Sequence, residues 1–136
     1  MIEDTSYEIS FSEMKKMVKN YFKQEGRNVD LIIECDEDVD HYSNSVETIM
    51  SLIEKVTIAG IRTTARSYFS IDDLKEVISE TFEKMGKSIT SIDINATLEK
   101  KYDGCYNSDS YENVIKNKSF TVNTKTNSLS LTKDNK

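Results

Sequence analysis

The clearest structural signal in the chain is residues 70–86, which read SIDDLKEVISETFEKMG. Ser70 is a good helix N-cap, and Asp73 stands where a capping box places its second partner. Apolar residues then recur every three or four positions, at Ile71, Leu74, Val77, Ile78, Phe82 and Met85. Gly86 follows where many helices end in a left-handed conformation. The stretch therefore predicts an amphipathic helix with one face in the core.

The same pattern occurs 60 residues earlier, where Ser10 is the cap, Glu13 its partner and Gly26 the stop. The apolar positions of this segment are Phe11, Met14, Met17, Val18, Tyr21 and Phe22. Because the cap, the apolar positions and the stop recur in register, the sequence predicts an internal duplication. Phe22 and Phe82 would then be equivalent core residues.

Alternation with a period of two follows each helix and predicts half-buried strands. The apolar members are Val29, Leu31, Ile33 and Cys35 in the first half, and Ile92, Ile94, Ala96 and Leu98 in the second. Polar loops are expected at residues 36–45 and 100–110. Two further strands are expected in each half, at 47–53 and 56–66 and at 111–115 and 119–123, with a turn at 116–118. A helix over 45–54 stays an alternative, since Val46, Ile49, Met50 and Ile53 also have helical spacing.

These elements predict an α+β fold built from a duplicated helix-plus-three-strand (αβββ) unit. About six antiparallel strands would form a sheet with both helices on one face. We expect a single domain over residues 1–125, made of repeats at about 7–66 and 67–124. Residues 126–136 are expected to be a polar tail, in which Leu129 and Leu131 are candidates for a short edge strand.

Composition favours a cytoplasmic protein with no membrane segment. No stretch approaches 18 consecutive apolar residues, and the first residues lack the basic and apolar parts of a signal peptide. Cys35 and Cys105 are not spaced as metal ligands, so free thiols are expected. The chain has no Pro and no Trp but many Lys, Asn, Ile and Ser, a usage typical of a low-GC bacterium or its phage.

Acidic residues are concentrated in one segment of a chain whose net charge is −6. Residues 30–54 contain eight carboxylates and no Lys or Arg. A dense acidic run can imitate a phosphate backbone and steer association with a basic groove. We therefore predict a non-enzymatic binding or regulatory protein, a nucleic-acid mimic or inhibitor, that engages a basic protein surface; homo-oligomerisation is left open. The candidate contact residues are Asp30, Glu34, Asp36, Glu37, Asp38, Asp40 and Glu47.

Residues 36–47 resemble the twelve-residue calcium loop of EF-hand proteins. Oxygen-bearing side chains stand at loop positions one, three, five, nine and twelve, which are Asp36, Asp38, Asp40, Asn44 and Glu47. His41 replaces the glycine at position six, and Ser43 replaces the apolar residue at position eight. The resemblance implies a hard-cation (calcium) site, which we keep as an alternative to a solvated acidic turn.

The first helix offers a second alternative, a nucleic-acid interface on its polar face. Its basic residues are Lys15, Lys16, Lys19 and Lys23, with Arg27 just beyond. The corresponding face of the second helix is net acidic, and no basic residues interleave with aromatic ones. Nucleic acid is therefore the less favoured partner, and the polar face of an ordinary amphipathic helix explains these lysines as well.

Catalysis is not indicated. His41 is the only histidine and belongs to no recognisable nucleophile–base pattern. The four glycines are scattered, so the sequence contains no glycine-rich phosphate loop. We expect neither an enzyme nor a cofactor.

Overall fold

The computed structural model describes residues 4–39, 44–102 and 111–126, so the predicted edge strand at Leu129 and Leu131 lies outside it. The elements in this part of the chain are β1 (Asp4–Ser10), α1 (Phe11–Gln24), β2 (Val29–Val39), β3 (Asn44–Ile58), β4 (Ile61–Tyr68), α2 (Ile71–Glu83), β5 (Lys87–Tyr102) and β6 (Tyr111–Thr126). All strand pairs are antiparallel. The α+β class predicted from the sequence is confirmed, with two helices and six strands.

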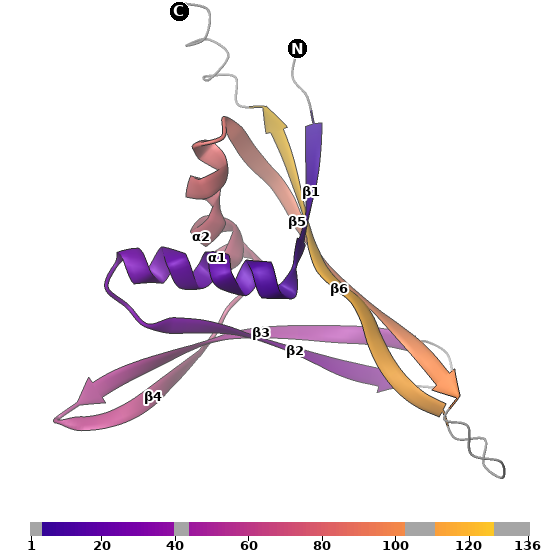
Figure 1. Cartoon of the computed structure of the whole chain (residues 1–136), viewed down its shortest axis with the longest axis horizontal. Helices are drawn as coiled ribbons and strands as arrows, with labels where there is room; N and C mark the ends of the chain where they lie inside the picture. The colour runs from indigo at the N-terminus through magenta and orange to yellow at the C-terminus, as the bar shows by residue number, and fades with distance from the viewer. Residues whose placement is uncertain (1–3, 40–43, 103–110, 127–136) are drawn as a thin grey trace, which may run out of the picture.

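Two three-stranded sheets replace the single sheet that the sequence predicts, with strand orders β2-β3-β4 and β1-β6-β5. In the first sheet, the β2–β3 hairpin that follows α1 pairs with β4, the strand before α2. In the second sheet, the β5–β6 hairpin that follows α2 pairs with β1, the strand before α1. The third strand of the second sheet is therefore β1, and the αβββ grouping is wrong for the second half of the chain. Figure 1 shows both helices in the angle between the two sheets.

Both helices begin at the predicted caps. The Ser10 hydroxyl accepts the amide N–H of Glu13, and the Ser70 hydroxyl accepts that of Asp73, each at 3.1 Å. The Asp73 carboxylate accepts the Ser70 amide in return at 3.0 Å, so α2 has a complete capping box. This backbone hydrogen bond lowers the pKa of Asp73. In α1 only the serine half of the box is present.

The core lies between the helices and the inner faces of both sheets. The largest fully buried side chains come from all of these elements and are Met14, Val18, Val29, Leu74, Ile78, Phe120 and Val122. Phe22 and Phe82 are also buried. Phe11 of α1 contacts Phe120 of β6, and Tyr7 of β1 contacts Phe82 of α2, both with ring centroids 5.2 Å apart. Each helix is thus fixed to the β1-β6-β5 sheet by an aromatic pair.

The end of α2 differs from the prediction. The helix ends at Glu83, and Met85 lies in the turn that leads to Gly86, whose φ is 75°. Met85 is therefore beyond the buried face of the helix and is 52% exposed. Its assignment to the core is wrong.

The polar loop predicted at residues 36–45 is strand at both of its ends, and the one predicted at 100–110 is strand in its first residues, up to Tyr102. β2 continues to Val39 and β3 begins at Asn44, and the β5–β6 hairpin extends in the same way. Antiparallel pairing satisfies the backbone amides and carbonyls whatever the side chains are. The strands of both hairpins can therefore stay paired in polar sequence beyond the part that packs on the hydrophobic core.

Residues 45–54 are strand, and the alternative of a helix there is wrong. β3 is continuous to Ile58, which pairs with Ile61 across a two-residue turn. Both turn residues, Ala59 and Gly60, have positive φ, at 51° and 79°. Such a turn matches the twist of a hairpin and favours glycine. The strand break predicted between residues 53 and 56 is therefore placed too early.

A β-bulge stands where the sequence predicts a turn at residues 116–118. The register between β5 and β6 shifts between Asn95 and Thr97, and Asn117 has a φ of 59°. Asparagine tolerates this left-handed conformation better than most residues. β6 therefore continues through the predicted turn with one extra residue.

Candidate functional site

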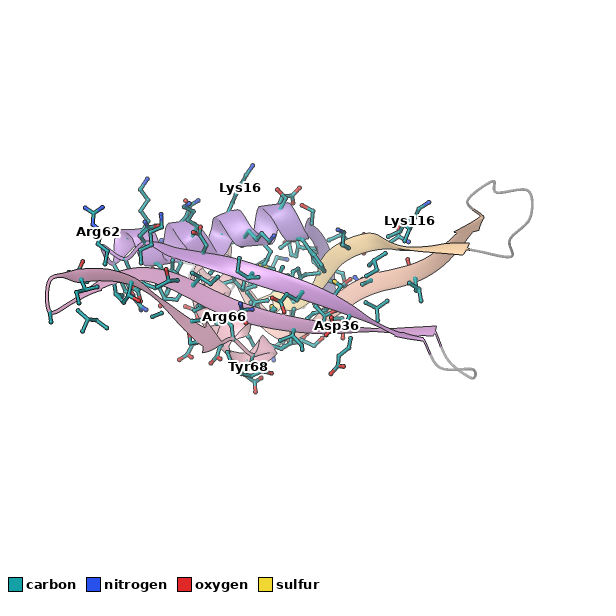
Figure 2. All side chains as sticks on the ribbon, turned by 90° about the horizontal axis from the view of Figure 1, so that it is seen from below. Lys16, Asp36, Arg62, Arg66, Tyr68 and Lys116 are labelled. Carbon is teal, nitrogen blue, oxygen red and sulfur yellow. The ribbon has the colours of Figure 1, made fainter. Side chains whose placement is uncertain are left out.

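The acidic segment forms the β2–β3 hairpin, and its carboxylates alternate with core residues along β2. Val29 and Leu31 are buried, whereas Asp30, Glu34 and Asp36 are exposed on the opposite face. This outer face of the β2-β3-β4 sheet points away from the helices. Figure 2 shows Asp36 and Arg66 on the sheet, and Lys16 pointing away from it on α1.

Cross-strand pairing sets the composition of this face row by row. Asp36 lies opposite Glu47, and Glu34 lies opposite Ile49. The next row is Ile32, Ser51 and Tyr68, and the one after it is Asp30, Ile53 and Arg66. Ile49 is 37% exposed and Tyr68 is 74% exposed. We name Glu34, Asp36, Glu47, Ile49 and Tyr68 the acidic face.

Two of the predicted contact residues already have cationic partners within the chain. Lys19 Nζ lies 3.1 Å from Asp30 Oδ1, and Arg66 Nη2 lies 2.7 Å from Glu34 Oε1. All four side chains are about half exposed, and such surface pairs contribute little to stability. They can exchange these partners for others at small cost.

Asp36 and Glu47 differ from Asp30 and Glu34, because their two carboxylates face each other directly across β2 and β3. Both are exposed, and neither has a cationic partner among the side chains that the structure describes. Like charges on opposite residues of an antiparallel pair are destabilising. Three predicted contact residues remain. Glu37 and Asp38 lie in β2, but the structure does not describe their side chains, and Asp40 lies outside the described residues.

The calcium-loop resemblance falls on the end of this hairpin. Its first and last ligand positions, Asp36 and Glu47, are brought opposite each other, and Asp38 and Asn44 belong to the paired strands. Asp40 is outside the described residues. Among those that are described, no group of three or more His, Cys, Asp or Glu side chains could hold a metal ion. Calcium binding stays a prediction.

The basic residues of α1 are exposed, as the sequence predicts for a polar helix face. Lys19 is paired with Asp30, and Arg27 makes two hydrogen bonds to Glu54, at 2.9 and 3.0 Å. The bonds to Glu54 raise the pKa of Arg27, and the bonds from Arg27 lower the pKa of Glu54. Arg27 also lies 4.8 Å from the ring centroid of Phe22. Two of the five proposed phosphate-binding residues, Lys19 and Arg27, are therefore already paired with carboxylates of the same chain.

The structure also brings together residues that no sequence pattern connects. A cleft of about 640 Å³ lies between α1, β2 and β6. It is lined by Ser10, Phe11, Ser12, Lys15, Ile33, Cys35, Ile115 and Lys118. The members from β6 are more than 75 residues distant along the chain from those of β2, so only the fold reveals the site.

No known protein family, curated protein or solved structure matches this chain. Neither helix in the described part of the chain is long and apolar enough to cross a membrane. Function must therefore be inferred from the chemistry of the surfaces described above.

Proposed function

We propose that the protein is a non-enzymatic binding protein that engages a basic partner through the acidic face. The observation that supports this most is the Asp36–Glu47 pair, in which two exposed carboxylates face each other across β2 and β3. A guanidinium or ammonium group from a partner would relieve their mutual repulsion and gain hydrogen bonds to both. Binding would thus remove an unfavourable interaction of the free protein.

The neighbouring residues also suit a protein interface. Ile49 and Tyr68 place exposed apolar surface beside the carboxylates. Protein interfaces commonly combine an apolar centre with a polar rim, and tyrosine is enriched in them. The net charge of −6 adds long-range attraction for a cationic partner. A partner that carries basic side chains around an apolar patch would be complementary to this face, as would a protein whose basic groove normally holds nucleic acid.

The test uses a fluorescein-labelled nona-arginine peptide as the probe and measures its affinity by fluorescence anisotropy. The site variant is Asp36→Asn with Glu47→Gln, and the matched control is Glu76→Gln with Glu83→Gln on α2. Both variants lose two exposed carboxylates, so the change in net charge is the same.

We expect the site variant to bind the peptide about threefold to tenfold more weakly than the control, since exposed ion pairs contribute up to about 1 kcal/mol each. The difference should shrink as salt is raised. Equal losses in the two variants would mean that only the overall charge matters, and that the acidic face is not a specific surface.

A hard-cation site at residues 36–47 is the second candidate function, because the fold brings Asp36 and Glu47 together. In this reading a calcium ion takes the place of the basic partner. The two proposals make opposite predictions for the effect of calcium on thermal stability.

We further propose that the two halves of the chain arose by duplication. Each half has the order strand, helix, strand, strand, and each helix starts at a serine cap. Phe22 and Phe82 are buried at matching positions of the two helices. The repeat that this order supports begins with β1 and β4, one strand earlier than the αβββ unit.

A further inference from the structure

The cleft between α1, β2 and β6 has the volume of a small-molecule site. Its volume of about 640 Å³ falls within the usual range for ligand pockets, about 300–1,000 Å³. Its lining residues belong to the start of α1, to β2 and to β6, and Figure 1 shows how these three elements are arranged. Its walls come from both sheets, so it exists only in the assembled fold.

The inner wall of the cleft is apolar. Phe11 is buried and packs against Phe120, which has no exposed surface. Ile33, Cys35 and Ile115 are partly exposed and face the cleft. A ligand that enters would cover this apolar surface, and its burial would favour binding.

The bulge in β6 determines which side chains line the cleft. Ile115 and Lys118 are three residues apart, and a regular strand would place them on opposite faces. The extra residue at Asn117 shifts the in-and-out alternation of side chains along β6 by one position. Ile115 and Lys118 therefore project from the same face and line the same cleft. Bulges commonly reorient side chains in this way beside functional sites.

Side-chain hydrogen bonds hold the bulge in place. Asn117 Nδ2 donates to Thr97 Oγ1 at 3.0 Å, and the Thr97 hydroxyl donates to the Lys116 carbonyl at 3.1 Å. The positive φ of Asn117 is therefore supported from the neighbouring strand β5. These bonds stabilise the backbone of the bulge, which sets the face of β6 from which Lys118 projects.

The charged side chains that the structure describes on the cleft have a single sign. Lys15 of α1 and Lys118 of β6 line it from two sides, and no carboxylate is among the lining residues whose side chains are described. Neither lysine has an ion-pair partner among the side chains that the structure describes. The hydroxyls of Ser10 and Ser12 add polar groups beside Lys15. In a protein with a net charge of −6, this is a local environment that favours an anion.

We propose that this cleft binds a small amphipathic monoanion, a medium-chain or aromatic carboxylate. The apolar body would lie against Phe11, Ile33 and Ile115, and the carboxylate would lie between Lys15 and Lys118. This site goes beyond the proposed function, because it lies on the inner side of β2 whereas Asp36 and Glu47 lie on the outer side.

Cys35 allows binding to be measured directly, since its thiol lines the cleft. In a Cys105→Ser background, the rate of alkylation of Cys35 by N-ethylmaleimide is followed by mass spectrometry with increasing octanoate. We expect saturable protection with a dissociation constant in the millimolar range, typical of a ligand of about ten heavy atoms. 1-Octanol, which lacks the charge, should protect about tenfold more weakly, and inorganic phosphate should not protect.

The lysines are tested with Lys15→Gln combined with Lys118→Gln. This variant should bind octanoate about tenfold more weakly, with its protection by 1-octanol unchanged. The matched control, Lys16→Gln with Lys125→Gln, removes the same charge from exposed positions outside the cleft and should bind octanoate as the wild type does. Absence of protection by octanoate would overturn the proposal. Equal protection by octanoate and 1-octanol, unaffected by either variant, would overturn the assignment of an anionic ligand.

Discussion

Replacing Glu47 with Lys should stabilise the protein, because it converts a repulsive cross-strand pair into an attractive one. Directly opposite residues place their side chains about 5 Å apart, where two unit charges in water interact by about 0.8 kcal/mol. Screening at physiological ionic strength leaves about 0.4 kcal/mol. Reversing the sign of one charge changes the free energy of unfolding by twice that amount, about 0.8 kcal/mol. For a chain of this size the melting temperature should rise by about 3 °C.

The measurement is thermal unfolding followed by circular dichroism, for a double-mutant cycle of Glu47→Lys, Asp36→Lys and their combination. Each single variant should be more stable than the wild type. The double variant restores a like-charged pair, so the gain should disappear. In 1 M salt the differences between all four proteins should nearly vanish. If the double variant is more stable than both single variants, the effect comes from overall net charge, and the facing carboxylates do not repel as argued.

Three further predictions concern the core, the calcium alternative and the bulge. Phe22→Ala and Phe82→Ala should each lower the free energy of unfolding by about 3–5 kcal/mol in urea titrations, and a loss below about 1 kcal/mol at either position would contradict their equivalence as core residues. Millimolar calcium should not change the melting temperature; a rise that Asp36→Asn with Asp38→Asn abolishes would favour the cation site instead. Asn117→Val should cost about 1–2 kcal/mol more than Asn117→Gly, because both lose the side-chain hydrogen bond to Thr97 but only the β-branched residue resists positive φ; equal costs would contradict the strain argument.

The helices could be predicted because their signals are local. Ser10 and Ser70 cap them, and the buried faces follow from spacing within a few residues. The strands β2 and β5 could be predicted from the alternation that begins at Val29 and at Ile92 for the same reason, although the full length of either strand, and the start of β5 at Lys87, could not. An acidic sequence such as that around Asp36 is typical of a loop, and its strand conformation depends on pairing with a partner strand.

The arrangement of the strands could not be predicted, because it depends on contacts between distant residues. The pairing of Tyr7 with Val122 completes the second sheet, and no pattern within β1 indicates this partner. The bulge at Asn117 resembles a turn in the sequence, since lysines flank an asparagine that tolerates positive φ in either setting.

The candidate sites were predictable to different degrees. The charge density of the acidic segment is visible in the sequence, but the facing of Asp36 and Glu47 requires the register of β2 and β3. The pairing of Glu34 with Arg66 also requires the fold, because these residues belong to different strands. The cleft beside Cys35 could not be predicted, because its walls come from three separated segments.

The central claim is that the acidic face, and not the basic face of α1, is the working surface. It is tested most directly by comparing the binding of labelled nona-arginine and labelled duplex DNA to the same protein at low and moderate salt. We predict salt-sensitive binding of the peptide and no binding of the DNA, since the net charge of −6 repels phosphate. DNA binding that weakens with salt with a log–log slope of about −4, and that Lys16→Glu with Lys19→Glu abolishes, would contradict the account.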